Sequence, residues 1–197
     1  MSPDGQFLIT AGQNTLNAAL SAVKVYQWNG TDWDLRWLRD GVMGTQIPAF
    51  CSISADGNVI AYSVAADLTG LDSVAIVARW NGTDYALQGD VLMTPDNGFG
   101  IDLQLSDSGD RVVIGAYSNS NAGANAGTTR IYQWSGSEWV QIGMDLDGEA
   151  ANDFSGLEVA LSAEAEFVVV AAAGNDGGGS NAGHVRVYEL NPMCPLL

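Results

Sequence analysis

Ser54-Ala55-Asp56-Gly57 is the stretch that decides the fold of this chain, because it recurs along the sequence with an apolar run behind each copy. The other copies are Ser2-Pro3-Asp4-Gly5, Ser106-Asp107-Ser108-Gly109 and the weaker Ser162-Ala163-Glu164-Ala165. Successive copies begin 52, 52 and 56 residues apart. A period of about 50 residues is typical of propellers and solenoids, in which no unit buries its apolar face alone. We therefore expect the 197 residues to form one repetitive domain.

The third unit shows most clearly which strands each repeat contains. Residues 100–106 alternate polar and apolar side chains, which indicates a half-buried strand. Residues 111–117 are largely β-branched and apolar, as expected of a strand that is covered on both faces. Residues 128–134 and 138–143 supply a third and a fourth strand. Four consecutive antiparallel strands form one sheet, and such a sheet must stack on similar sheets to cover its apolar faces.

A tryptophan hairpin keeps the same period and joins the third strand of a unit to the fourth. Its copies are Trp28-Asn29-Gly30-Thr31-Asp32-Trp33, Trp80-Asn81-Gly82-Thr83-Asp84-Tyr85 and Trp134-Ser135-Gly136-Ser137-Glu138-Trp139. We predict an all-β chain, a β-propeller of four-stranded antiparallel blades that is incomplete, with about 3.5–4 blades present. The expected units are residues 1–45, 46–97, 98–149 and 150–192, followed by a tail at 193–197.

The two end units each lack one expected strand. The first unit begins at its second strand and the last ends after its third, which gives 3, 4, 4 and 3 strands. These incomplete ends do not combine into one whole blade, so the outer faces of the end blades should stay exposed. We expect either a truncated piece of a larger propeller or self-association through the exposed end blades.

The composition excludes several classes of partner. The chain has 23 acidic residues against 7 Lys and Arg, a formal net charge of −16, which disfavours nucleic acid and anionic membranes. No apolar run reaches the length that inserts into a bilayer, and no signal peptide is visible. Cys51 and Cys194 are too few for a disulfide framework, and we interpret Cys51 as a small buried apolar residue.

Short motifs at the repeat boundaries resemble FG-GAP repeats, which build the propeller of integrin α subunits and of many secreted microbial and algal proteins. The matching stretches are Phe99-Gly100, Phe154-Ser155-Gly156, Val113-Ile114-Gly115-Ala116, Gly127 to Tyr132, Gly183 to Tyr188, and Gly143 to Glu149. The second unit departs from the pattern, because Pro48-Ala49-Phe50 stands where Phe-Gly would fall. WD40 repeats fit less well, since the Trp33-Asp34 pair does not recur.

The resemblance implies calcium, because integrin-type repeats often bind it in an acidic loop between the first and second strands. That connection here is the Ser-x-Asp-Gly turn, which offers one carboxylate where calcium needs six to eight oxygens, so the family's site is not carried over. The weak calcium candidates that remain are Asp145, Asp147, Glu149 and Asp153. A solvated loop is the favoured interpretation, so the expected cofactor is none, with calcium as the alternative.

Three other features have both a functional and a structural interpretation. The tryptophans could stack on sugars, but their recurrence favours packing, and only Trp37 has no counterpart in the other units. The Asn, Ser and Gly loops at 119–127 and 175–183 should gather on one face, where they bind a ligand or simply connect strands. His184 lies in an expected strand without a nucleophile at readable spacing, so no catalytic residue is assigned.

From these observations and the resemblance we expect a non-enzymatic interaction or adhesion module. It would be a fragment of a secreted or cell-surface FG-GAP-like propeller, located outside the cell as part of a longer chain. Its partners would be a protein or glycan ligand, without nucleic acid or membrane insertion. The alternative is an accessory propeller fragment of a polysaccharide hydrolase or lyase.

Overall fold

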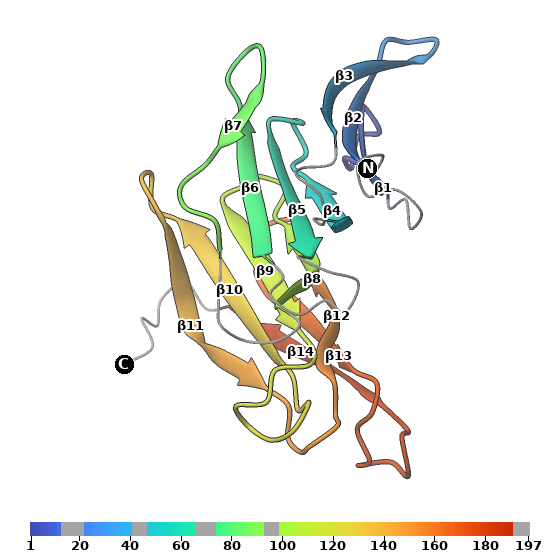
Figure 1. Ribbon diagram of the computed structural model, residues 1–197, viewed down its shortest axis with the longest axis vertical. Coiled ribbons are helices and arrows are strands. Elements are labelled where there is room, and N and C mark those ends of the chain that lie inside the picture. The colour runs from blue at the N-terminus through green and yellow to red at the C-terminus, as the bar shows by residue number, and fades with distance from the viewer. Residues whose placement is uncertain (13–21, 41–46, 66–73, 93–98, 191–197) are drawn as a thin grey trace.

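The computed structural model describes residues 1–12, 22–40, 47–65, 74–92 and 99–190. Within these ranges the chain forms fourteen β-strands and no helix, so none of the described segments is a helix that could cross a membrane. The strands make four antiparallel sheets of 3, 4, 4 and 3 strands, in which neighbours in sequence are neighbours in space. The prediction of an incomplete β-propeller is therefore confirmed (Figure 1).

Each sheet is one blade, and its strands follow the repeat. Blade 1 contains β1 (Phe7–Gly12), β2 (Ala22–Trp28) and β3 (Trp33–Asp40). Blade 2 contains β4 (Ile47–Ile53), β5 (Val59–Ala65), β6 (Val74–Trp80) and β7 (Tyr85–Leu87). Blade 3 contains β8 (Phe99–Leu105), β9 (Arg111–Ala116), β10 (Thr128–Trp134) and β11 (Trp139–Asp147). Blade 4 contains β12 (Ser155–Leu161), β13 (Phe167–Ala172) and β14 (His184–Glu189).

The Ser-x-Asp-Gly turns are held by their own side chains. The Ser54 hydroxyl donates to Asp56 Oδ1 at 2.7 Å and accepts the Val59 N–H at 2.9 Å. Gly57 has a φ of 66°, which favours glycine. The interpretation of this motif as a turn is confirmed, and the turn has a second role that the sequence did not reveal. The Ala55 N–H donates to the Asp107 carbonyl of the next blade's turn at 2.9 Å, so the turn also joins neighbouring blades.

The apolar core lies between the blades, in three separate clusters. One side of β5 and β6 packs against blade 1, and their other side packs against blade 3. The third cluster joins blade 3 to blade 4 through Val113, Ile131 and Val168, which are at most 2% exposed. Cys51 is half-buried and packs against the cluster between blades 1 and 2, and burial raises the pKa of its thiol. Cys194 lies outside the described residues.

Glycine permits the close approach of blades 3 and 4. A methyl group on Gly115 of β9 would lie 2.0 Å from the Gly156 carbonyl oxygen of β12, which no side chain can tolerate. Gly156 itself has a φ of 82°. These two glycines belong to the motifs that resemble FG-GAP repeats, and the structure gives them a packing role that is independent of any family.

The inner edge of blade 4 is covered by side chains from blade 3. Asp102 Oδ2 accepts the Val159 N–H at 2.7 Å, and Gln104 Oε1 accepts the Leu161 N–H at 2.8 Å. Ser52 does the same one blade earlier, where its hydroxyl accepts the Leu105 N–H at 3.0 Å. Backbone donors at a sheet edge would otherwise need water or a new strand. These bonds therefore fix the distance between consecutive inner strands.

Removing the Asp102 carboxylate should destabilise the contact between blades 3 and 4. We expect Asp102→Ala to lower the free energy of unfolding by about 2 kcal/mol, because the N–H groups of Val159 and Leu103 lose their acceptor. Urea denaturation at pH 7 measures this change. Glu158→Ala is the matched control: Glu158 holds the equivalent place on the exposed side of blade 4, and its loss should change stability by less than about 0.5 kcal/mol. Equal effects of the two substitutions would contradict the bridging role.

The same carboxylate predicts a pH effect. Burial raises the pKa of Asp102, so the folded state holds this proton more tightly than the unfolded state. Its contribution to stability is present below the ordinary pKa of 3.8 and declines as pH rises through the folded value. Asp102→Asn keeps an acceptor oxygen and cannot ionise, so this decline should be absent from its stability–pH profile.

Candidate functional site

The longer connections gather at one end of the blades. Because adjacent strands run antiparallel, the Ser-x-Asp-Gly turns and tryptophan hairpins share one end, and the β9–β10, β11–β12 and β13–β14 connections share the other (Figure 1). We call this second end the loop end. There the β9–β10 connection bonds to the β11–β12 connection, through the Asn152 N–H to the Ala124 carbonyl at 2.8 Å. The predicted gathering of the Asn, Ser and Gly loops on one face is confirmed for residues 119–127 and 175–183.

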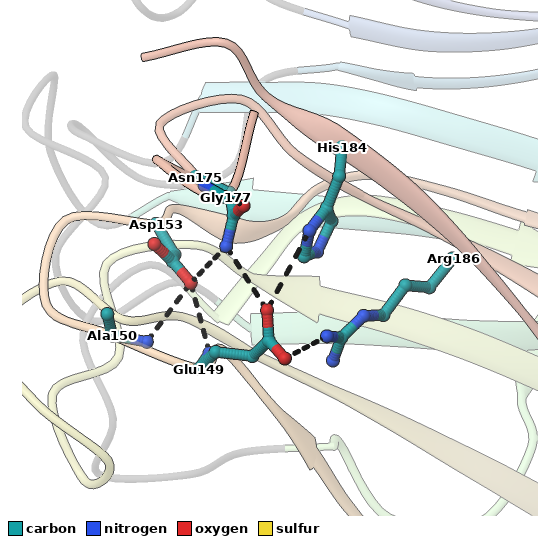
Figure 2. A network of polar contacts seen from close by, with 7 residues as sticks. All are labelled: Glu149, Ala150, Asp153, Asn175, Gly177, His184 and Arg186. Carbon is teal, nitrogen blue, oxygen red and sulfur yellow. Dashed lines mark hydrogen bonds and ion pairs between the residues drawn. The ribbon is translucent and has the colours of Figure 1, made fainter. Parts of the chain in front are cut away.

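A buried aspartate organises the β11–β12 connection. Asp153 is 2% exposed, and its Oδ2 accepts the backbone N–H groups of Glu149 and Ala150, each at 3.0 Å (Figure 2). Asn175, 5% exposed in the β13–β14 connection, donates its Nδ2 to the same oxygen at 3.0 Å. One carboxylate oxygen thus joins the β11–β12 connection to the β13–β14 connection. This arrangement holds the backbone of Glu149 in a fixed position.

Glu149 presents its carboxylate to two side chains of β14. Arg186 Nη2 forms an ion pair with Glu149 Oε1, and His184 Nδ1 lies 3.9 Å from Oε2 (Figure 2). Asn175 Nδ2 also donates to Oε2 at 3.3 Å. His184 and Arg186 are two residues apart in a strand, so they point to the same face of the sheet. We call Glu149, Asn175, His184 and Arg186 the loop-end cluster.

The electrostatics of the loop-end cluster keep both members of its ion pair charged. The hydrogen bond from Arg186 holds the pKa of the Glu149 carboxyl below its usual value, and the same bond raises the pKa of the guanidinium. The Glu149 and Arg186 side chains are 51% and 38% exposed, so both remain accessible to a solute. The cluster therefore offers a charged acceptor, a planar charged donor, an amide and an imidazole within reach of solvent. Such a set can bind hydroxyl or carboxyl groups and can take up or release a proton at His184.

The four calcium candidates do not act as one group. Asp145 accepts two hydrogen bonds from Arg130, at 2.9 and 2.7 Å, and the Arg130 guanidinium lowers the pKa of this carboxyl. Glu149 faces Arg186, and Asp153 accepts backbone N–H groups. Over the ranges that the structure covers, no three His, Cys, Asp or Glu side chains are arranged to hold a metal ion. The structure brings together only Glu149 and Asp153, through Asn175.

The recurring tryptophans pack across their hairpins, as predicted. Trp28–Trp33 and Trp134–Trp139 have ring centroids 5.5 Å apart, and each pair faces directly across two strands. The unmatched Trp37 also packs between blades. Its ring lies 5.3 Å from that of Tyr85 at an interplanar angle of 68°, and its Nε1 donates to Asp84. These contacts give the aromatic side chains a structural role.

Sequence reasoning found part of the loop-end cluster. The sequence identifies Glu149 as a candidate ligand and places Asn175 in a loop that could bind a ligand, and it also names Asp153, which anchors the cluster. It does not find Arg186, the cation that pairs with Glu149. His184 was assigned no functional partner, whereas the fold places it beside Glu149. The missed signal was the alternation His184-x-Arg186, which puts a histidine and an arginine on the blade face toward Glu149.

Comparison with known proteins supports the fold alone. No protein-family model matches the chain, and no curated protein matches it. Among solved structures, it is similar to a proposed 6-phosphogluconolactonase from Bacteroides uniformis (TM-score 0.59, 12% identity, 99% of this chain and 53% of that one). It is also similar to a hypothetical selenium-binding protein from Sulfolobus tokodaii (0.63, 8%, 96% and 50%) and to a periplasmic gluconolactonase from Pseudomonas aeruginosa (0.56, 12%, 93% and 50%). The chain spans about half the length of these proteins.

These similarities correct two expectations. The propeller is supported, but two of the three neighbours named above are of the gluconolactonase type, and none of the three is an FG-GAP propeller of the integrin kind. The expectation of a non-enzymatic adhesion module is wrong, because two of these neighbours are described as lactonases, which are enzymes. The physical reason for the error lies in the motifs: Gly115 and Gly156 are required by blade packing, so they mark a propeller rather than one family.

Asp153 should be essential for the geometry of the loop-end cluster. We expect Asp153→Ala to lower the free energy of unfolding by about 3 kcal/mol, because the buried Asn175 amide and two part-buried backbone N–H groups lose their carboxylate acceptor. Chemical denaturation at neutral pH measures the loss. Asp147→Ala removes an exposed carboxylate from the same segment, so it should have little effect. A small loss for Asp153→Ala would show that the loops do not depend on this bond network.

Proposed function

We propose that this chain is the propeller portion of a carbohydrate-active hydrolase, and that its loop-end cluster contacts a sugar-derived substrate. The observation that carries the proposal is the accessible Glu149–Arg186 pair, with Asn175 and His184 beside it. Rigid blades hold these side chains on connecting loops and at a strand start, where binding and catalytic groups commonly lie. The likeness to gluconolactonase propellers favours an enzyme over an adhesion module.

The chemistry of the loop-end cluster suits a polyhydroxylated substrate. The Glu149 carboxylate accepts hydrogen bonds from hydroxyl groups, while Arg186 and Asn175 donate to hydroxyl, carbonyl or carboxylate oxygens. His184 can take a proton from a water that attacks a carbonyl or acetal carbon and can later return it to the leaving oxygen. Glu149 would then act on the substrate by binding and by stabilising the protonated imidazole.

A panel of sugar lactones and soluble polysaccharides tests the proposal. We expect turnover of at least one member. Proton release measures it for a lactone, and the appearance of new reducing ends measures it for a glycan. Glu149→Gln should lower kcat/KM at least about 100-fold, because it removes the charge that pairs with Arg186 and faces His184. Glu189→Gln is the control. Glu189 is an exposed acid of β14, the strand that carries His184 and Arg186, and its substitution should change kcat/KM by less than about twofold.

The pH dependence of substrate affinity is a second test of the loop-end cluster. Since Arg186 lowers the pKa of Glu149, substrate affinity that depends on this carboxylate should persist down to its ordinary value of 4.5 and fall only at lower pH. Absence of turnover and of binding across the panel would overturn the proposed function. Turnover that Glu149→Gln leaves unchanged would remove the loop-end cluster from the substrate site.

A further inference from the structure

The two end blades of the stack have open faces. We call the side of a blade that points toward the next blade along the chain its trailing face, and the opposite side its leading face. Val185 and Val187 on the trailing face of blade 4 are each 64% exposed, and Phe167 beside them is 42% exposed. An apolar surface of this kind on a rigid sheet is typical of an interaction site.

The repeat shows what such a face normally contacts. A cross-strand pair holds the same place on every trailing face: Ile9–Val25 in blade 1, Ala61–Val77 in blade 2, Val113–Ile131 in blade 3 and Val169–Val187 in blade 4. The first three pairs are at most 6% exposed, because the leading face of the following blade covers them. Among these four pairs only the fourth is uncovered, and its Val187 side chain is 64% exposed. The trailing face of blade 4 is therefore built to receive a leading face.

The chain itself carries an open leading face of the required kind. Thr10 of blade 1 is exposed, whereas the residues at its repeat position, Tyr62, Ile114 and Val170, are at most 2% exposed. Leu8 and Tyr26, which face each other across β1 and β2, lie on the same side and are only half-buried. This face is the counterpart of the surfaces that cover the first three trailing faces.

We propose that the trailing face of blade 4 binds the leading face of blade 1 of a second copy of this chain. The contact would continue the blade stacking already present three times within the chain. It would be heterologous, since different surfaces of the two copies meet, and a closed dimer forms if the second contact of the same kind completes the ring.

Two further observations favour a second copy. The similar propellers are about twice as long as this chain, so two copies supply a comparable length of propeller. The exposed acids beside the apolar surface of blade 4 are Glu158 and Glu189, and the leading face of blade 1 carries Lys24, which can pair with one of them. The net charge of −16 on each copy opposes association, and added salt should therefore strengthen the dimer.

Sedimentation velocity over a range of concentrations tests the contact. We expect the wild-type chain to reach twice its 20.6 kDa mass, with stronger association at higher salt. Val187→Glu should weaken the dimer at least about 100-fold, because it places an unpaired carboxylate in an apolar interface. Val140→Glu is the matched control: Val140 is a valine that is 46% exposed on β11, and this substitution should leave association unchanged.

A mixing experiment tests whether the contact is head to tail. Val187→Glu disables the trailing face and Thr10→Glu disables the leading face, so each variant alone should be monomeric. A one-to-one mixture retains one intact contact between the two variants, and dimers should reappear. Both positions are exposed on strands, and circular dichroism verifies that the variants fold.

Three outcomes would overturn the proposal. A wild-type chain that stays monomeric up to about 100 µM would show that these faces do not bind each other. A dimer that Val187→Glu leaves intact would place the contact elsewhere. A Thr10→Glu chain that still forms dimers, when Val187→Glu does not, would indicate a symmetric contact between two blade 4 faces. None of these outcomes depends on turnover, so the proposal stands or falls separately from the proposed function.

Discussion

A four-stranded sheet that is apolar on both faces gains little stability alone, because every uncovered valine or isoleucine leaves its surface in water. This chain meets the constraint by stacking one sheet on the next. Val112 and Val113 are neighbours in β9 and point to opposite faces, yet both are fully buried, one against blade 2 and the other against blade 4. The interior of the protein is therefore a series of layers between blades, and each blade depends on its neighbours.

Polar bonds at the two ends of the blades fix how the layers are oriented. At the turn end, backbone bonds run from Ala55 to Asp107 and from Asp107 to Ala163, so each turn is placed by the next one. Along the inner edge, Asp102 and Gln104 accept donors of β12. Because the blades are held in this way, the β11–β12 and β13–β14 connections lie side by side at the loop end, and Asn175 can donate a hydrogen bond to Asp153 between them. The position of Glu149 relative to Arg186 is thus a consequence of the stacking.

The repeat made the blades predictable from the sequence, because alternation and turn chemistry are local. The tryptophan pairs and the strand count of each unit followed from spacing alone, as Trp134 and Trp139 illustrate. The loop-end cluster was less accessible, because Glu149 and Arg186 are far apart in sequence and meet only through the contact of two blades. The family resemblance misled for a physical reason: Gly115 is required by the close contact between blades 3 and 4, so it reports on blade packing and not on one family. Function depends on a few side chains at such contacts, which a repeat pattern does not specify.

Hydrogen exchange of β9 and β13 tests the stacking account most directly. Both are second strands of their blades and are bonded to strands on either side, but β9 is covered on both faces and β13 on one. In dilute solution, about 1 µM, where a second copy contributes little, the amides of β9 should exchange at least about tenfold more slowly than those of β13. Equal protection of the two strands, or greater protection of β13, would show that the stability of a blade does not come from the blades on either side of it.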